Sequence, residues 1–291
     1  MDFLWFMYLQ IWRFTMGKKV IFLDIDGTLT VAGSNIPPES ALRAIHMAQD
    51  NGHQVFLCTG RNYDMLKPLL SYGFDGTVAS AGGYIRCGGQ TIYDCPMSQK
   101  QQQLVLNTLE ENGIFRTIEC LDGTYTDDGF KEFLEEHAGE NGNSELLRWR
   151  RQIEKELNIR SMREYSGQPV YKVVVMSPGL KRLELAKEKL EREFLFCIQD
   201  TDSQGIVNGE VVNRQFDKGK AVARVCEYLH IPVEDSVAFG DSMNDKEMLE
   251  TAGYSVCMEN GSSALKKLAD EICPGVEQDG LYHSFLRLGL I

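Results

Sequence analysis

The sequence lacks the features that mark zinc-binding, disulfide-bonded and nucleic-acid-binding proteins. Its eight cysteines form no C-x-x-C pair and have no flanking His at metal-ligand spacing, so we interpret them as reduced core residues of a cytoplasmic protein. Thirty basic residues stand against 42 acidic ones, and no basic run offsets the net charge of −12. Such a charge repels phosphate backbones and anionic lipids. We therefore expect no nucleic-acid partner.

Several other ligand motifs and all repeat patterns are also missing. None of the five histidines is placed like a metal ligand. The chain shows no repeat of about 20–50 residues and no low-complexity tract, which excludes solenoids and propellers. The glycines between Gly83 and Gly89 are not followed by a βαβ unit with an acidic residue, so they do not form a dinucleotide-binding fingerprint.

Residues 1–16 differ from the rest of the chain because they are almost entirely apolar and aromatic. They lack the basic start and small-residue cleavage site of a signal peptide, and they are shorter than the roughly 20 residues of a membrane helix. Met16-Gly-Lys-Lys then reads like an ordinary soluble start. We interpret residues 1–16 as a non-catalytic extension, with a membrane-associated anchor as the alternative. We expect no stable membrane insertion.

From Lys18 onward, short apolar runs alternate with amphipathic stretches, which predicts an α/β fold with a parallel sheet. At 291 residues and 43% hydrophobic, the chain can form about two domains. The apolar runs predict strands over 20–24, 55–58, 77–79, 236–239 and 254–257. The amphipathic stretches predict helices over 38–51, 62–72, 220–230 and 243–252.

The middle of the chain has a different texture and predicts an inserted α+β domain. It contains glycine-rich turns, a polar helix over 98–112 and a strand over 171–176. We predict a core domain formed by residues 17–83 and 206–291, with an inserted cap domain over 84–205.

Asp24 and Asp26 directly follow the first predicted strand, in DIDGTLT. Ligands of open parallel sheets bind outside the carboxyl ends of the strands, and residues two apart on an extended chain point the same way. Two converging carboxylates repel unless a divalent cation such as Mg²⁺ neutralises them. A calcium-binding EF-hand loop is excluded, because its positions 6 and 12 would be Leu29 and Asn35.

A second acidic group, Asp241, Asn244 and Asp245, follows the strand predicted over 236–239. It too lies at a strand's carboxyl end and at a helix start. Helix N-capping is the alternative explanation for Asp241 and Asn244. The order of the two acidic motifs along one chain favours a shared site.

Two further positions fit such a site. Thr59 ends the second strand in LCTGR, where its hydroxyl and the backbone N–H groups from Gly60 onward can hold a phosphoryl oxygen. Lys218, in DKGKA, can supply a fixed cation, although a surface position is the default for a single lysine.

In this order, DIDGTLT, LCTGR, DKGKA and GDSMNDKEML resemble the four motifs of the haloacid dehalogenase-like (HAD) hydrolases. The long insert resembles that of the Cof-type, IIB-capped phosphatases. The resemblance implies a Rossmann-like parallel-sheet core with an inserted α+β cap of type C2B. One departure lies at 79–85, where ASAGGYI replaces the Asn-Gly frequent in Cof-type relatives.

The resemblance also implies a role for each site residue. Asp24 is expected to be the nucleophile that forms an aspartyl-phosphate, and Asp26 the general acid and base. Thr59, Gly60, Lys218 and Asn244 are expected to bind the phosphoryl group. Asp24, the Asp26 carbonyl, Asp241 and Asp245 are expected to serve the Mg²⁺.

We therefore expect a cytoplasmic, Mg²⁺-dependent phosphoric monoester hydrolase. Its substrate would be a small phosphorylated metabolite, such as a sugar phosphate or a phosphorylated cofactor, enclosed by the cap. A carboxylate at Asp26 favours phosphatases and phosphomutases over relatives that cleave carbon–halogen bonds. A phosphomutase and a non-catalytic protein that binds phosphorylated metabolites remain the alternatives.

Overall fold

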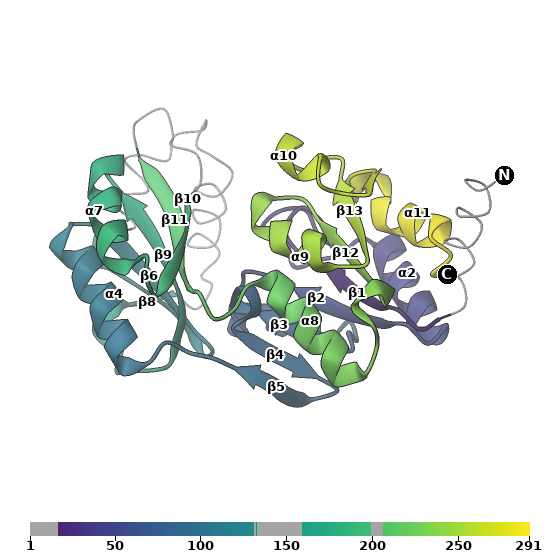
Figure 1. Cartoon of the computed structure of the whole chain (residues 1–291), viewed down its shortest axis with the longest axis horizontal. Coiled ribbons are helices and arrows are strands. Elements are labelled where there is room, and N and C mark those ends of the chain that lie inside the picture. The colour runs from purple at the N-terminus through teal and green to yellow at the C-terminus, as the bar shows by residue number, and fades with distance from the viewer. Residues whose placement is uncertain (1–16, 131, 133–158, 199–205) are drawn as a thin grey trace. The chain divides into compact units, whose positions relative to one another are not determined.

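The computed structural model describes residues 17–130, 132, 159–198 and 206–291, which form two compact units (Figure 1). The described part of the first unit comprises residues 17–60, 68–93 and 217–291, and the second comprises 61–67 with the described part of 94–216. The predicted extension over residues 1–16 lies outside the described residues. Among the helices that the structure describes, none combines the length and apolar character needed to cross a bilayer.

The first unit is built on an eight-stranded sheet with the order β14-β13-β12-β1-β2-β3-β4-β5. Its strands are β1 (Val20–Leu23), β2 (Gln54–Cys58), β3 (Gly76–Ala79), β4 (Tyr84–Cys87), β5 (Gln90–Asp94), β12 (Ser236–Gly240), β13 (Tyr254–Met258) and β14 (Glu271–Cys273). Every pairing from β14 to β3 is parallel, and β3 pairs with β4 antiparallel. The predicted α/β class with a parallel sheet is confirmed.

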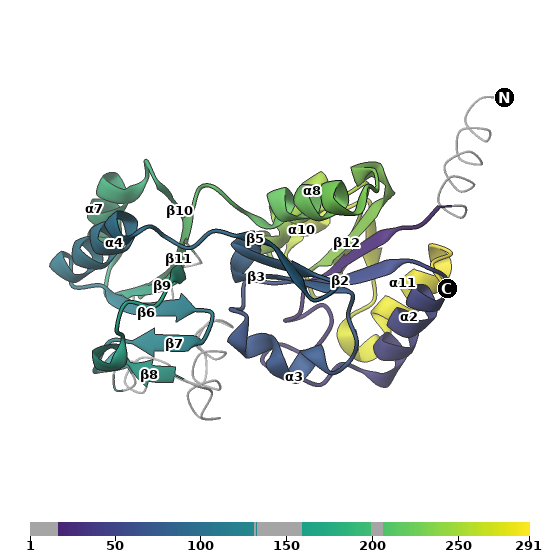
Figure 2. The ribbon, with the colours of Figure 1, turned by 90° about the horizontal axis from the view of Figure 1, so that it is seen from below.

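Helices cover both faces of this sheet, as Figure 2 shows. One group contains α8 (Lys218–Leu229), α9 (Lys246–Thr251) and α10 (Ser263–Lys266). The other contains α2 (Glu39–Asp50), α3 (Lys67–Leu70) and α11 (Gly280–Arg287). The 3-10 turns of this unit are η2 (Ser80–Gly82), η4 (Val233–Asp235), η5 (Met243–Asp245) and η6 (Val276–Gln278), whereas η1 (Asp64–Leu66) belongs to the second unit. Because both faces are covered, the central strands are fully buried and read as continuous apolar runs.

The second unit is a six-stranded sheet, ordered β10-β11-β9-β6-β7-β8, with two helices packed on one face. The strands are β6 (Phe115–Cys120), β7 (Gly123–Thr126), β8 (Ile159–Ser161), β9 (Val170–Ser177), β10 (Phe194–Ile198) and β11 (Val207–Asn213). The helices are α4 (Gln99–Glu111) and α7 (Leu180–Leu190), and η3 (Met162–Glu164) is a 3-10 turn. Helix α4 begins at a capping box in which Ser98 and Gln101 bond each other's backbone.

The boundaries between the units differ from those predicted at residues 84 and 205. The Gly88-Gly89 turn makes a hairpin, and β4 extends the first sheet by pairing with β3, so the first unit continues to Tyr93. At the other end, β11 pairs with β9 and β10, and the second unit continues to Phe216. Composition alone did not reveal these pairings, because hairpin glycines also suit an irregular insert.

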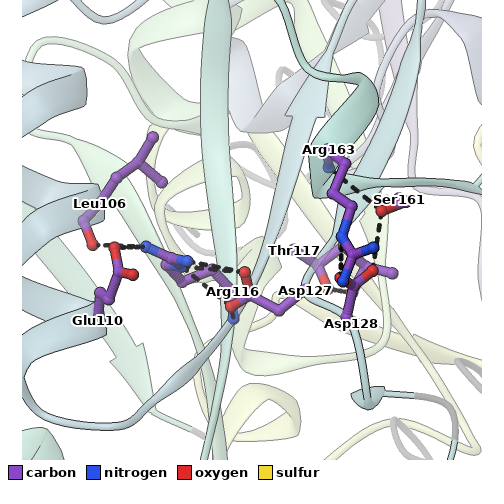
Figure 3. Close-up of polar contacts among 9 residues, drawn as sticks. Leu106, Glu110, Arg116, Thr117, Asp127, Asp128, Ser161 and Arg163 are labelled. Atoms are coloured by element: carbon purple, nitrogen blue, oxygen red, sulfur yellow. Dashed lines mark hydrogen bonds and ion pairs between the residues drawn. The ribbon is translucent and has the colours of Figure 1, made fainter.

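An ion-pair network ties β6, β7 and α4 together in the second unit (Figure 3). The Arg116 guanidinium donates from Nε and Nη2 to the Asp127 carboxylate at 2.8–3.3 Å. Its Nη1 donates to Glu110 at 2.8 Å and to the Leu106 carbonyl at 3.0 Å. The planar guanidinium thus matches a carboxylate with two parallel bonds, which fixes the turn after β7.

The described residues include all eight cysteines of the chain. Six are buried, as predicted for core residues, but Cys95 is partly exposed and Cys197 is exposed. Cys197 lies on β10, which ends the order of its sheet among the strands that the structure describes.

Candidate active site

Three neighbouring parallel strands end at the same edge of the first sheet and present the predicted site residues. In the register, Leu23 of β1 lies beside Leu57 of β2 on one side and Phe239 of β12 on the other. Asp24 therefore follows β1, Thr59 follows β2, and Asp241 follows β12 at adjacent strand ends. β1 lies between β2, the next strand along the chain, and β12, which comes from the C-terminal part of the chain. The strand order reverses direction here, and open α/β sheets bind ligands at such a point.

Lys218 is the first residue of α8, and it enters the same edge of the sheet. Asp217 caps the helix by accepting a hydrogen bond from the Lys220 N–H at 2.7 Å. The Lys218 Nζ donates to Asp24 Oδ1 at 2.7 Å and to Asp245 Oδ1 at 2.5 Å. Its side chain is 1% exposed. Lys218 is thus a buried cation held between two carboxylates, and not a surface lysine, which is the usual position of a single lysine.

Three carboxylates gather around this lysine. One oxygen each from Asp24, Asp241 and Asp245 lies within 4.8 Å of the others. Asp245 Oδ2 accepts hydrogen bonds from the backbone N–H groups of Asp241 and Ser242, at 3.0 and 3.1 Å. In contrast, Asp241 Oδ1 is buried and has no hydrogen-bond partner within the described residues. An orphaned carboxylate oxygen beside two further carboxylates fits the donor set that a hard divalent cation prefers.

The excess of negative charge raises the pKa of two of these carboxyl groups. Burial, followed by the charge of Asp245, raises the pKa of Asp24 to about 7, although Lys218 opposes the shift. Burial, followed by the charge of Asp24, raises the pKa of Asp241 to about 8. Burial lowers the pKa of Lys218, but Asp24 and Asp245 outweigh it, so that pKa is raised. One lysine therefore does not neutralise the three carboxylates.

Two glycines let the motifs approach closely. Gly27 has φ of +87°, and a Cβ there would lie 2.4 Å from Asp241 Oδ2. A Cβ on Gly240 would lie 2.6 Å from the Asp245 side chain.

The Asn260 side-chain amide donates to the Gly27 carbonyl, at 2.8 Å. We did not predict Asn260 from the sequence, although its position just after the parallel strand β13 is a signal of the same kind.

Asp26 lies beside this cluster but is not one of its three carboxylates. Its Oδ1 accepts a hydrogen bond from the Gly33 N–H at 2.7 Å. The acid–base role of Asp26 stays a prediction.

The remaining predicted residues take peripheral positions. Thr59 is 2% exposed, and its N–H donates to the Val78 carbonyl at 2.9 Å. Its role in binding a phosphoryl oxygen, with Gly60, stays a prediction. The Asn244 Oδ1 accepts from the Ser242 hydroxyl at 2.9 Å and from Lys218 at 3.5 Å. This leaves the Asn244 NH₂ group as its donor end.

The segment that departs from the Asn-Gly pattern has an unusual backbone. Ser80, Ala81 and Gly82 have φ of +50°, +56° and +104°. The Ala81 N–H donates to the Thr59 carbonyl at 2.9 Å, and a Cβ on Gly82 would lie 2.5 Å from the Asp217 carbonyl. Asn tolerates the left-handed region better than Ala does, so the sequence here pays a local conformational cost.

Comparison with known proteins agrees with this geometry. The family model for haloacid dehalogenase-like hydrolases matches residues 21–285. The chain belongs to this family. Phosphatase YwpJ of Bacillus subtilis is 26% identical over 93% of this chain and 99% of its own, and the HMP-PP phosphatase of Yersinia pseudotuberculosis is 29% identical over 91% and 93%. The solved structure of BT4131, titled a HAD subclass IIB sugar phosphatase, has a TM-score of 0.74 at 21% identity and covers 94% of this chain and 100% of that one. The predicted HAD resemblance and the Rossmann-like parallel-sheet core are thus confirmed.

Proposed function

We propose that this protein is a Mg²⁺-dependent phosphatase that hydrolyses a small phosphorylated metabolite through an aspartyl-phosphate at Asp24. The observation that carries the proposal is the buried cluster of Lys218 with Asp24, Asp241 and Asp245, drawn from separate motifs. The membership of the family and the phosphatase names of YwpJ and the Yersinia protein support the hydrolysis of phosphoric monoesters. A cytoplasmic location stays a prediction.

In the first step, an Asp24 carboxylate oxygen attacks phosphorus, and the ester P–O bond breaks. Asp26, in its protonated form, gives its proton to the leaving oxygen. In the second step, Asp26 takes a proton from water, the water oxygen bonds to phosphorus, and the Asp24–phosphorus bond breaks to release phosphate. Covalent catalysis of this kind divides one difficult displacement into two easier ones.

Charge stabilisation supplies much of the rate enhancement in phosphoryl transfer. Lys218 would offset charge on the phosphoryl oxygens, and the Thr59 hydroxyl, the Gly60 N–H and the Asn244 amide would orient them. A divalent cation held by Asp24, Asp241 and the Asp26 carbonyl would supply further positive charge. Asp245 would support this site from behind, since its two oxygens already accept bonds from Lys218 and from two backbone N–H groups.

The test is phosphate release from a panel of sugar and cofactor phosphates, with and without Mg²⁺. We expect turnover of at least one ester that requires the metal and disappears in Asp24→Asn. Asp50→Asn makes the same chemical change at an exposed residue in the last turn of α2 and should leave turnover unchanged. Turnover by a correctly folded Asp24→Asn variant would refute the nucleophile assignment.

The same panel separates the two alternatives. A phosphomutase would form an isomeric phosphate ester with little inorganic phosphate, because the phosphoryl group returns to the product. A non-catalytic binding protein would retain ligand with no turnover, with or without Mg²⁺. Each outcome would replace the hydrolase proposal.

A further inference from the structure

We propose that Thr30 is a positioning residue for the acid–base step. Its hydroxyl folds the 30–34 turn so that the Gly33 N–H holds the Asp26 carboxylate in its working orientation. The inference rests on the proposed function, since it takes Asp26 to be the general acid and base. Thr30 is the last residue of DIDGTLT, but neither it nor Gly33 has been given a role above.

The contacts of Thr30 close a small turn directly behind Asp26. Thr30 is fully buried, and its hydroxyl lies 3.2 Å from the Ile25 carbonyl and 3.1 Å from the Ser34 carbonyl. The Thr30 carbonyl accepts the Gly27 N–H at 2.8 Å, and its N–H donates to Ile25 at 2.9 Å. The side chain of Thr30 thus connects the nucleophile loop to the far end of the turn.

At the other end of this turn, Gly33 contacts the Asp26 carboxylate. The Ser34 N–H donates to the Val31 carbonyl at 2.9 Å, which closes the turn around Gly33. Gly33 has φ of +78°, a conformation that glycine adopts without strain, and its N–H then donates to Asp26 Oδ1 at 2.7 Å. Since that bond restrains one carboxylate oxygen, it restricts rotation of the Asp26 side chain.

Orientation matters because a general acid must lie within hydrogen-bond reach of the leaving oxygen. Loss of orientation should therefore slow the hydrolysis of esters whose leaving group needs a proton. An ester with a good leaving group, such as p-nitrophenyl phosphate, depends far less on the acid. A defect confined to folding would lower both rates equally.

The experiment compares kcat for p-nitrophenyl phosphate with kcat for the alkyl phosphate that the unmodified chain hydrolyses fastest. Thr30→Val keeps the shape of the side chain and removes the hydroxyl. We expect about a tenfold fall in kcat for the alkyl ester, a fraction of the roughly 10²–10⁴-fold contribution of general acid–base catalysis, and less than about a threefold fall for the aryl ester. Thr30→Ser should restore the alkyl rate.

Thr77→Val is the matched control. Thr77 is a buried threonine of β3 whose hydroxyl has no hydrogen-bond partner in the described part of the chain. It should keep the ratio of the two rates. If Thr30→Val does not fold, Gly33→Ala tests the other end of the turn, because its Cβ meets open space and only the positive φ is strained. Equal falls on both esters, or a rate that Thr30→Ser does not restore, would overturn the proposal.

Asp26→Asn in the same assay separates this inference from the function on which it rests. An Asp26→Asn variant without selective loss of the alkyl rate would refute the acid–base assignment itself. A selective loss in Asp26→Asn with none in Thr30→Val or Gly33→Ala would refute only the positioning role.

Discussion

The cluster around Arg116 in the second unit and the cluster around Lys218 in the first differ in how far their carboxylates are exposed to solvent. In the second unit, Arg116 satisfies Asp127 with parallel hydrogen bonds, and its other partner, Glu110, is 68% exposed and solvated. In the first unit, Lys218 lies among three carboxylates, and the pKa values of Asp24 and Asp241 are raised to about 7 and 8. An ion pair whose second carboxylate is solvated serves structure, whereas buried carboxylates in excess of their cation can bind a further cation.

The largest expected difference comes from removing each cation. Lys218→Met should lower kcat by about 10²–10³-fold, the usual effect of losing one preorganised donor to a charged transition state. It should also destabilise the first unit, because Asp24 and Asp245 lose their buried partner. Arg116→Met should cost about 1–3 kcal/mol of unfolding free energy, since Asp127 loses its charged hydrogen bonds, with kcat per folded molecule little changed. Steady-state kinetics and thermal unfolding of both variants test this contrast. An equal fall in kcat in Lys218→Met and Arg116→Met would contradict it.

The second expected effect is stabilisation by a divalent cation. A ligand that binds only the folded state stabilises it by about 2.7 kcal/mol at one hundred times its Kd. We expect Mg²⁺ to raise the midpoint of thermal unfolding, and Asp241→Asn to reduce that rise because it replaces one oxygen of the three-carboxylate cluster. Asp127→Asn, in the Arg116 cluster, is the control and should keep the Mg²⁺ response. A rise that is the same in Asp241→Asn would place the cation elsewhere.

The sequence predicts which residues meet at the carboxyl edge of the sheet, but it does not predict the individual hydrogen bonds that they make there. Asp24, Thr59 and Asp241 each follow an apolar run, and the carboxyl ends of parallel strands necessarily meet, so their proximity was predictable. The pairing of Asp245 with Lys218, the orphaned oxygen of Asp241 and the bond from Gly33 to Asp26 were not. They depend on loop geometry that no periodicity encodes.

The boundaries of the two compact units depend on pairings of the same kind. The glycine-rich run after Cys87 is compatible with either a hairpin or an irregular insert, and only the pairing of β4 with β3 decides between them. The bounds of one helix also differ from those predicted. The helix predicted over 62–72 is the 3-10 turn η1 followed by the four-residue helix α3, which contains Pro68, a residue without the backbone N–H that a longer helix would need there.

The smallest expected effect is a pH dependence of stability that comes from His53, outside the candidate active site. The Lys19 N–H donates to His53 Nδ1 at 3.0 Å, and burial, followed by the charge of Lys19, lowers the pKa of this histidine below 6.5. The folded state therefore binds the proton less readily than the unfolded state. Stability from this residue is fully present above about pH 6.5 and is lost as the pH falls toward the lower pKa of the folded state. The slope should stay below the roughly 1.4 kcal/mol per pH unit of one full proton. His53→Asn retains an acceptor and should remove this part of the slope in unfolding measured from pH 7.5 to 5, while an unchanged slope would exclude His53 as its source.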